Sequence, residues 1–492
     1  VGAVATSQNE RKQRLAYLLA LAYLLSLLLA WVLPQSLGGS SLPDMLQATV
    51  RFGLPLLPLV ILFLPVYLWQ RKPAPVHVKP VLLFFIYALL TVALAYLRFL
   101  PAYKQQSAVS AGIEGAVTIL LGLLFYLVSV SLPDSRDKID KTLRLINWTG
   151  LVMVVWSILQ LVIEPIFPSS RTFINQFQTY ISPTRLLVDR MQGFASEPSW
   201  LAHMLNLVFL AYWLAASYSR TSVHSFRLWK FSFENLLAFL GIIVLAGTLS
   251  RGGLLAFMLV VALIFLLLNI RLVRWMVRKV GQKRRFVSVI GITLGLITLY
   301  LALLAAGLWG WSRIDPRMET VFQFSSEAEN PLIEYADNLR FGERVVYWQT
   351  GWNIFNDQPF IGVGVGFSGF YFPEYLPDTG WGLSETRKLL FRSDGLLNIK
   401  NLWSRLLAET GIIGFALFIT FLVLFAITSI EMAKRGPGMR RTLGFMGLFM
   451  LVALIAEEFS VDSFALPYLW FSMGLVTAGW RWYTPVIGEE NG

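Results

Sequence analysis

Four short stretches of the sequence place polar or charged side chains beside apolar segments. Pro198 suits the first turn of a helix, which puts Glu197 of GFASEPSW at a helix start. In GTLSRGGLLAF, Ser250 can cap the following helix, and Arg251 then stands at its N-terminus. The other two stretches are GERVVYWQTGWNIF, with Glu343 and Arg344, and NIKNLWSRLLAET, with Lys400, Asn401, Arg405 and Glu409.

The basic residues in these stretches suit the binding of a phosphate group. A helix N-terminus has free N–H groups and a partial positive charge of about half an electron. An arginine adds a planar fork that matches two phosphate oxygens at once. We therefore expect Arg251, Arg344 and Lys400 to converge on a polyanion at the membrane–water boundary, and a lipid diphosphate is the polyanion found at that depth.

Each of these charged residues also has a structural interpretation. A basic residue at the interface can anchor a helix by extending its charged end into water. Glu197 can be a favourable charge at a helix N-terminus, and Glu343 can pair with Arg344. Arg405 and Glu409 have the i,i+4 spacing of a helical ion pair. Ionisable residues within a membrane span are nevertheless functional candidates by default.

The elements that must position these residues are membrane helices. Of the 492 residues, 56% are hydrophobic and 14% are charged, whereas a soluble domain carries about a quarter charged residues. Long apolar runs predict an all-α polytopic membrane protein with about 12 transmembrane helices and a large external loop. The predicted spans are 15–34, 50–69, 80–98, 111–131, 146–163, 199–217, 233–250, 252–270, 286–310, 401–429, 442–457 and 463–480.

The distribution of Lys and Arg predicts the orientation of these spans. Basic segments such as RKQR, SRDKIDKTLR and KRGPGMRR fall on one side if the helices alternate, and that side is expected to be the cytoplasm, with both termini. The four stretches then lie on the opposite, periplasmic face. We divide the chain into helices one to five with a first external loop (1–198), helices six to nine (199–310), a large periplasmic loop (311–400) and helices ten to twelve (401–492).

The composition argues against several other classes of protein. The chain has no cysteine, and its histidines, His77, His203 and His224, lack metal-ligand spacing, so we predict neither a metal site nor a cofactor. His203 is interpreted as a core residue. The net charge of +12 is attributed to topology and anionic lipid rather than to nucleic acid. IGVGVGFSG lacks the GK[ST] of a phosphate-binding loop and is interpreted as a flexible or close-packed turn.

The external loop is rich in aromatic residues. Within it, ERVVYWQTGWNIF is expected to form an amphipathic helix with Val345, Trp348, Trp352 and Phe355 on one stripe. Such a helix can lie on a membrane surface. The tryptophans suit an interfacial belt, and their flat faces also suit sugar rings.

Taken together, the four stretches resemble the bacterial O-antigen ligase and O-antigen polymerase superfamily, whose polymerases are often called Wzy-type. The similar segments are EPS at a helix start, SRGGLL at a helix junction, ERVVYWQTGWNIFNDQPFIGVGVG and KNLWSRLLAETGIIG. They occur in the family's order and cover residues 190 to 430. The resemblance implies a metal-independent, membrane-embedded glycosyltransferase of the GT-C kind. Such an enzyme takes sugars from undecaprenyl diphosphate at the outer face of the inner membrane.

The resemblance also implies roles for individual residues. Arg251 and Arg344 match the family's essential arginines, whereas Lys400 stands where the ligases usually carry a histidine. Lysine keeps a cation for the diphosphate but is a poor base at neutral pH. Together with the EPS motif, this departure favours a polymerase. The general base is expected to be Glu197 first and Glu409 second. Substrate contacts are expected from Lys400, Asn401, Arg405, Trp348 and Ser250.

Three alternatives to a polymerase stay open. An O-antigen ligase would move the glycan from undecaprenyl diphosphate onto lipid A–core. A transporter of lipid-linked sugars would need charges deep in several spans and gating at both faces, whereas this chain concentrates its charge on one face. A peptidoglycan polymerase of the shape–elongation–division type would share the topology, but its motifs are not recognised here. The expected partners of a polymerase are the lipid-linked oligosaccharide donor and acceptor, membrane lipid and possible chain-length regulators.

Overall fold

The computed structural model describes residues 74–98, 100–166, 197–279, 285–314, 341–393 and 395–483, together with 172, 174–176, 178, 186 and 190–195. Their regular secondary structure is helical apart from one hairpin of two short antiparallel strands, β1 (Arg227–Leu228) and β2 (Phe231–Ser232). The prediction of an all-α polytopic membrane protein is confirmed. The helices of the described part are α4 (Val78–Ala95), α5 (Ala108–Ser131), α6 (Arg136–Ile166), α8 (Pro198–Met204), the π-helical η3 (Leu205–Phe209), α9 (Leu210–Ser219), α10 (Phe233–Gly247), α11 (Arg251–Lys279), α12 (Arg285–Ile314), α14 (Gly342–Asp357), α15 (Ser368–Tyr375), the 3₁₀-helical η6 (Asp378–Gly382), α16 (Ser384–Phe391), α17 (Leu402–Arg435), α18 (Gly438–Glu457) and α19 (Pro467–Tyr483).

Eight helices in the described part are long and apolar enough to cross a membrane, and α10 is a shorter apolar helix. Each predicted span from 80–98 onward coincides with a helix, including 463–480, which coincides with α19. The predicted spans 15–34 and 50–69 lie outside the described residues, so the number of twelve stays a prediction.

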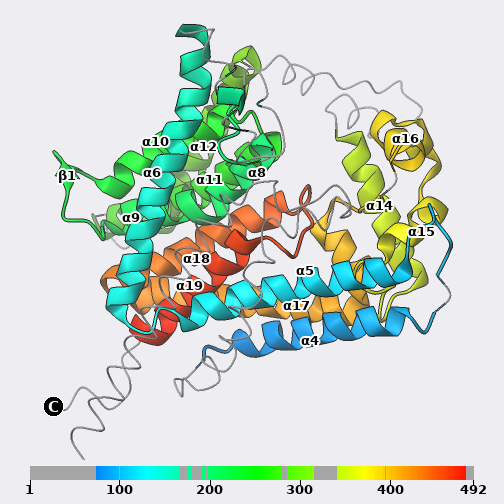
Figure 1. The fold of residues 1–492 in the computed structure, drawn as a ribbon. Helices are drawn as coiled ribbons and strands as arrows, with labels where there is room; N and C mark the ends of the chain where they lie inside the picture. The colour runs from blue at the N-terminus through cyan, green and yellow to red at the C-terminus, as the bar shows by residue number, and fades with distance from the viewer. Residues whose placement is uncertain are drawn as a thin grey trace, which may run out of the picture.

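One group of helices packs closely around an aromatic core. In Figure 1, α4, α5, α17, α18 and α19 run side by side, and α17 contacts both α4 and α18. The ring centroids of Phe84 and Phe418 lie 5.1 Å apart, and those of Phe85 and Trp470 lie 4.8 Å apart. By contrast, α12 turns exposed apolar side chains such as Leu294 and Leu301 outward. Such a surface is typical of contact with lipid.

The glycine-rich stretch between α14 and α15 packs the segment from α14 to α16 against the helix bundle. Gly362, Gly364 and Gly366 all have positive φ angles, which glycine adopts without steric cost. A Cβ atom at Gly364 would lie 2.8 Å from the Thr91 carbonyl oxygen, and one at Gly366 would lie 2.6 Å from the Ala111 carbonyl oxygen. Of the two interpretations of this stretch, the close-packed turn is the one observed.

α17 is kinked where this turn meets it. Gly411 has φ 61° and ψ −169°, and a Cβ atom there would lie 2.3 Å from the carbonyl carbon of Phe360. The kink leaves backbone groups free to pair with the turn. The Val363 N–H donates to the Ala408 carbonyl at 2.8 Å, and the Ile412 N–H donates to the Pro359 carbonyl at 2.8 Å. These bonds hold the segment that runs from α14 through α16 beside one end of the bundle. The segment is drawn in yellow in Figure 1.

Segments predicted to lie on one face of the membrane do meet at one end of the molecule. Arg98 follows α4 and donates to the Gly362 carbonyl at 2.5 Å. The Met191 N–H donates to the Gly247 carbonyl at 2.8 Å, and the Leu402 N–H donates to the Glu458 carbonyl at 2.8 Å. This agrees with the alternation of spans. That the shared end faces the periplasm stays a prediction.

Candidate functional site

A compact cluster of charges lies where the segment from α14 to α16 meets α17. Lys400 precedes α17 with a φ of 49°, and its N–H donates to Asn398 Oδ1 at 2.7 Å and to Asp462 Oδ2 at 3.1 Å. Its Nζ atom forms a short ion pair with Glu385 Oε1 and lies 5.3 Å from the centroid of the Tyr347 ring. The Tyr347 hydroxyl donates to the same Glu385 oxygen at 3.2 Å.

Arg344 belongs to the same cluster. Burial raises the pKa of the Glu385 carboxyl, but the hydrogen bond and charge of Lys400 and the charge of Arg344 outweigh it, so the pKa lies below its ordinary value. Burial, followed by the Glu385 charge, raises the pKa of Tyr347 well above its usual range. Two cations therefore face one carboxylate at neutral pH. The Arg344 Nη1 atom is buried and has no hydrogen-bond partner in the described part of the chain.

A second, fully buried network begins one turn into α17. Arg405 Nε donates to Glu409 Oε2 at 2.9 Å, and Arg405 Nη1 donates to the Asp462 carbonyl at 2.9 Å. The Asp462 carboxylate lies 3.5 Å from the same Nη1 atom. The other oxygen of Glu409 accepts a hydrogen bond from Ser368 Oγ at 2.7 Å. Arg405 and Glu409 thus form the helical ion pair that their spacing indicates.

Side-chain caps are present at two helix starts, and the sequence analysis predicts the one at Ser250. Asn401 Oδ1 accepts from the Ser404 N–H at 3.0 Å and caps α17. Ser250 Oγ accepts from the Gly253 N–H at 3.4 Å and caps α11, so Arg251 stands in the first turn as expected. Only the three residues 248–250 connect α10 to α11, so the two helices are joined by a short corner and not by a loop.

Glu197 lies directly before α8, with Pro198 in the first turn of that helix. Its side chain is exposed and makes no cap hydrogen bond to the helix, while Oε2 accepts a hydrogen bond from Ser199 Oγ at 3.2 Å. The carboxylate therefore keeps acceptor capacity for a further group.

The predicted amphipathic helix exists as α14, but its tryptophan stripe is not the face that packs. Trp348 and Trp352 are 46% and 44% exposed, whereas Val346, Tyr347 and Ile354 are buried on the other face. The packed face lies against α17. The tryptophans thus remain open to membrane or ligand, and the helix is positioned by residues outside the expected stripe.

The sequence analysis missed a buried acidic cluster around His203. The His203 Nδ1 atom lies 2.6 Å from the Tyr468 hydroxyl, and its Nε2 atom lies 3.3 Å from Glu458 Oε1 and 3.7 Å from Glu457 Oε2. Asn206, within η3, donates to Glu457 Oε1 at 2.7 Å. His203 is buried as predicted. The two glutamates at the end of an apolar span were a signal that could have found this cluster.

The turn between α18 and α19 contacts three of these parts: Lys400, Arg405 and the start of α11. Asp462 touches both Lys400 and Arg405. On the α11 side, a Cβ atom at Gly252 would lie 3.4 Å from Ser460 Oγ, which brings the start of α11 to the same turn. The stretches around Arg251 and Lys400 therefore both reach this turn, which the sequence analysis did not include. Their convergence on one polyanion stays a prediction. No group of three or more potential metal-ligating side chains is found within the described residues.

The geometry can now be set beside known proteins. Residues 236–419, from α10 into α17, match a protein-family model described as O-Antigen ligase. The matched region contains Arg251, Arg344, Lys400 and Arg405, whereas Glu197 lies outside it. No curated protein shows a significant match to the chain.

Proposed function

Residues 236–419 place this chain in the O-antigen ligase and polymerase superfamily, and on that premise we propose that it polymerises glycans carried on undecaprenyl diphosphate. The multi-pass helical architecture and the family agree with a membrane enzyme of the ligase or polymerase type. The observation that carries the proposal is the cluster of Arg344 and Lys400 around a single carboxylate, with a buried guanidinium nitrogen that lacks a partner.

The proposed reaction is a displacement at the anomeric carbon of the donor glycan. A hydroxyl of a second lipid-linked repeat unit attacks this carbon, the carbon–oxygen bond to the diphosphate breaks, and the configuration is inverted. Charge develops on the departing diphosphate. Arg251, Arg344 and Lys400 stabilise it, and loss of one such contact typically costs about 100-fold in rate.

The proton of the attacking hydroxyl goes to a general base, for which we propose Glu197. Its exposure and its single weak partner support this choice, because a base must be able to reach the acceptor. Both oxygens of Glu409 are already hydrogen-bonded, and its side chain is 1% exposed. We therefore propose that Glu409 is a positioning residue, which acts by fixing Arg405 and the Asp462 turn.

The second candidate function is transfer onto lipid A–core, since the matching family model is described as a ligase. Lys400 favours the polymerase. Its side chain pairs with Glu385, and lysine can serve as a cation but is a poor base at neutral pH, unlike the histidine that the ligases usually carry. The same proposal places the protein in the inner membrane, with the site facing the periplasm. It also includes a chain-length regulator as a partner.

A reconstitution tests the proposed function. The purified protein in nanodiscs is given an undecaprenyl-diphosphate-linked repeat unit in the presence of EDTA, and a ladder of longer lipid-linked glycans is expected. Arg344→Ala should lower the rate by about 100-fold, while Arg387→Ala, an exposed arginine of α16, should leave it unchanged. Transfer only onto added lipid A–core would identify a ligase. Equal rates for the two variants would refute the diphosphate site.

A further inference from the structure

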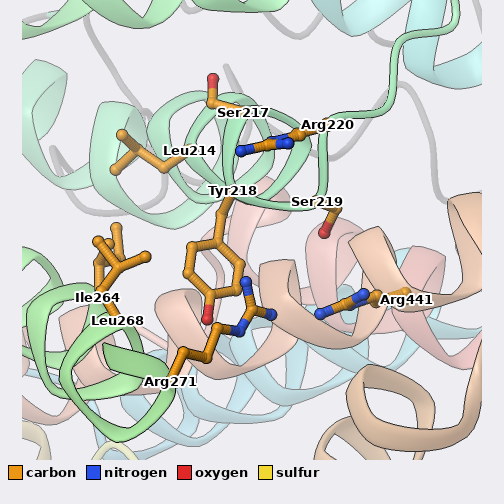
Figure 2. Close-up of a pocket in the computed structure, with 9 residues that line it drawn as sticks. All are labelled: Leu214, Ser217, Tyr218, Ser219, Arg220, Ile264, Leu268, Arg271 and Arg441. Atoms are coloured by element: carbon orange, nitrogen blue, oxygen red, sulfur yellow. The ribbon is translucent and has the colours of Figure 1, made fainter. Parts of the chain in front are cut away.

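A cavity of about 610 Å³ lies between α9, α11 and α18, well away from the site described above. Figure 2 shows its lining, which includes the three arginines Arg220, Arg271 and Arg441 around the ring of Tyr218. Among the described residues that line it, none is acidic. A concave site with three guanidinium groups and no carboxylate is suited to an anion.

This cavity lies at the opposite end of the helices from the glycosyl-transfer site. Along α11, twenty residues separate Arg251 from Arg271, which corresponds to about 30 Å at a rise of 1.5 Å per residue. α18 runs the other way, from Arg441 near its start to Glu457 at its end. The cavity therefore belongs to the face that the distribution of basic residues predicts to be cytoplasmic.

The arginines of this cavity are not neutralised within the described part of the chain. Arg440, next to Arg441 in the sequence, pairs with Glu431 at 3.2 Å, but Arg441 forms no ion pair with a described residue. The Arg441 Nε and Ser219 Oγ atoms are buried, and neither has a hydrogen-bond partner among the described residues. Leaving such groups unsatisfied costs free energy, which a bound acceptor would recover.

The arginines are held in position by aromatic rings. The Arg271 guanidinium carbon lies 4.5 Å from the centroid of the Tyr218 ring, and that of Arg441 lies 5.6 Å from the Phe445 ring. In Figure 2 the guanidinium groups of Arg271 and Arg441 point toward one another beside Tyr218. Like charges repel at such an approach, so an anion between them would stabilise the arrangement.

The remaining wall of the cavity indicates what the anion is attached to. Leu214, Ile264 and Leu268 line it, and Leu268 is 43% exposed on the outer surface of α11. An apolar wall below a basic rim matches a phosphate headgroup with an acyl chain. We propose that this cavity binds the phosphate ester of an anionic phospholipid from the membrane leaflet opposite the glycosyl-transfer site.

Native mass spectrometry of the full-length protein in neutral detergent tests this proposal, with phosphatidylglycerol as the added lipid. The pocket variant Arg271→Gln/Arg441→Gln should retain the lipid with at least about tenfold lower affinity. The control Arg227→Gln/Arg435→Gln removes two exposed basic charges outside the pocket and should bind like the wild type. The single variant Arg271→Gln, at an exposed position, gives the same test if the double variant does not fold.

A second arm of the experiment separates the two sources of phosphate. Inorganic phosphate at millimolar concentration should neither displace the lipid nor bind with the same dependence on Arg271 and Arg441. If inorganic phosphate displaced the lipid and its binding depended on Arg271 and Arg441, the cavity would still be an anion site, but its assignment to a lipid would be overturned. Equal losses in the pocket and control variants would show only diffuse attraction and would refute the site. Lipid binding needs no glycan donor, so this result is independent of the proposed glycosyl transfer.

Discussion

The network around Arg405 allows the contribution of its buried ion pairs to stability to be separated from the role of Glu409 in the reaction by mutation. One guanidinium compensates both Glu409 and Asp462, and all three side chains are buried. Replacing Arg405 with Gln leaves two negative charges without a counter-charge. Breaking a buried pair costs about 3–5 kcal/mol, so we expect Arg405→Gln to lower the free energy of unfolding by at least that amount.

Glu409→Gln should be much milder. The substitution removes one of two negative charges, and Arg405 keeps its bonds to Asp462. The amide oxygen can still accept the Ser368 hydrogen bond. The expected cost is the weakened bond to Arg405, roughly 1–3 kcal/mol. Because these retained bonds keep Arg405 and the Asp462 turn in place, the rate of glycan transfer should change little in Glu409→Gln. Glu197→Gln, which removes the proposed base, should lower the rate by about 100-fold or more.

Two assays on the same purified variants check these values. Unfolding by SDS titration in mixed micelles gives the order of stability, and transfer from the lipid-linked donor gives the rate. Arg387→Gln, at an exposed position, serves as the control for loss of an arginine. The reasoning is refuted if Glu409→Gln abolishes transfer at unchanged stability while Glu197→Gln stays active, because Glu409 would then be the base.

Three further predictions concern the segment from α14 to α16 and its contacts with α17. Gly411→Ala should destabilise the protein by about 3 kcal/mol or more, because the φ and ψ angles suit only glycine and a Cβ atom would clash with Phe360. The control Gly291→Ala has open space around the new Cβ atom and should not destabilise the protein. Thermal unfolding compares the two variants. Because Glu385 has a lowered pKa, its stabilising pair is present above its ordinary pKa of 4.5 and lost as the pH falls below it. Unfolding midpoints measured against pH should show this loss in the wild type and not in Glu385→Gln. Inhibition of glycan transfer by a lipid monophosphate and by a lipid diphosphate should show tighter binding of the diphosphate. The ratio of the two inhibition constants should be smaller in Glu385→Gln than in the wild type.

The sequence predicts the parts of this molecule that depend on local patterns. Apolar runs give the helices, and Ser250 and Asn401 are caps because a short polar side chain before an apolar run can accept a hydrogen bond from the new helix. The meeting of the stretches at one end follows from alternating spans. The order of elements and the residue types are sufficient for these predictions.

Other features depend on contacts between distant residues, which no local pattern encodes. Glu385 pairs with Lys400 across an irregular segment, and nothing in the surrounding periodicity singles it out. α14 has apolar residues on both faces, so its pattern could not tell whether Trp348 or Tyr347 would pack inward. Packing against the distant helices α17 and α15 decides this, and the ring centroids of Tyr347 and Phe372, in α15, lie 5.6 Å apart.

The pair between Lys400 and Glu385 also bears on which ligand the site can accept. The Glu385 carboxylate is paired with Lys400, so a phosphate group that binds Lys400 must replace an anion already in place. A monophosphate ester carries about −1.5 to −2 charges at neutral pH, but on a single phosphoryl group. A diphosphate can displace the carboxylate and also reach Arg344, whose Nη1 atom has no partner in the described part of the chain. Such an exchange would favour the intact diphosphate carrier over its monophosphate. This selectivity would depend on Glu385, because its negative charge repels both ligands and only the diphosphate gains enough contacts to overcome the repulsion.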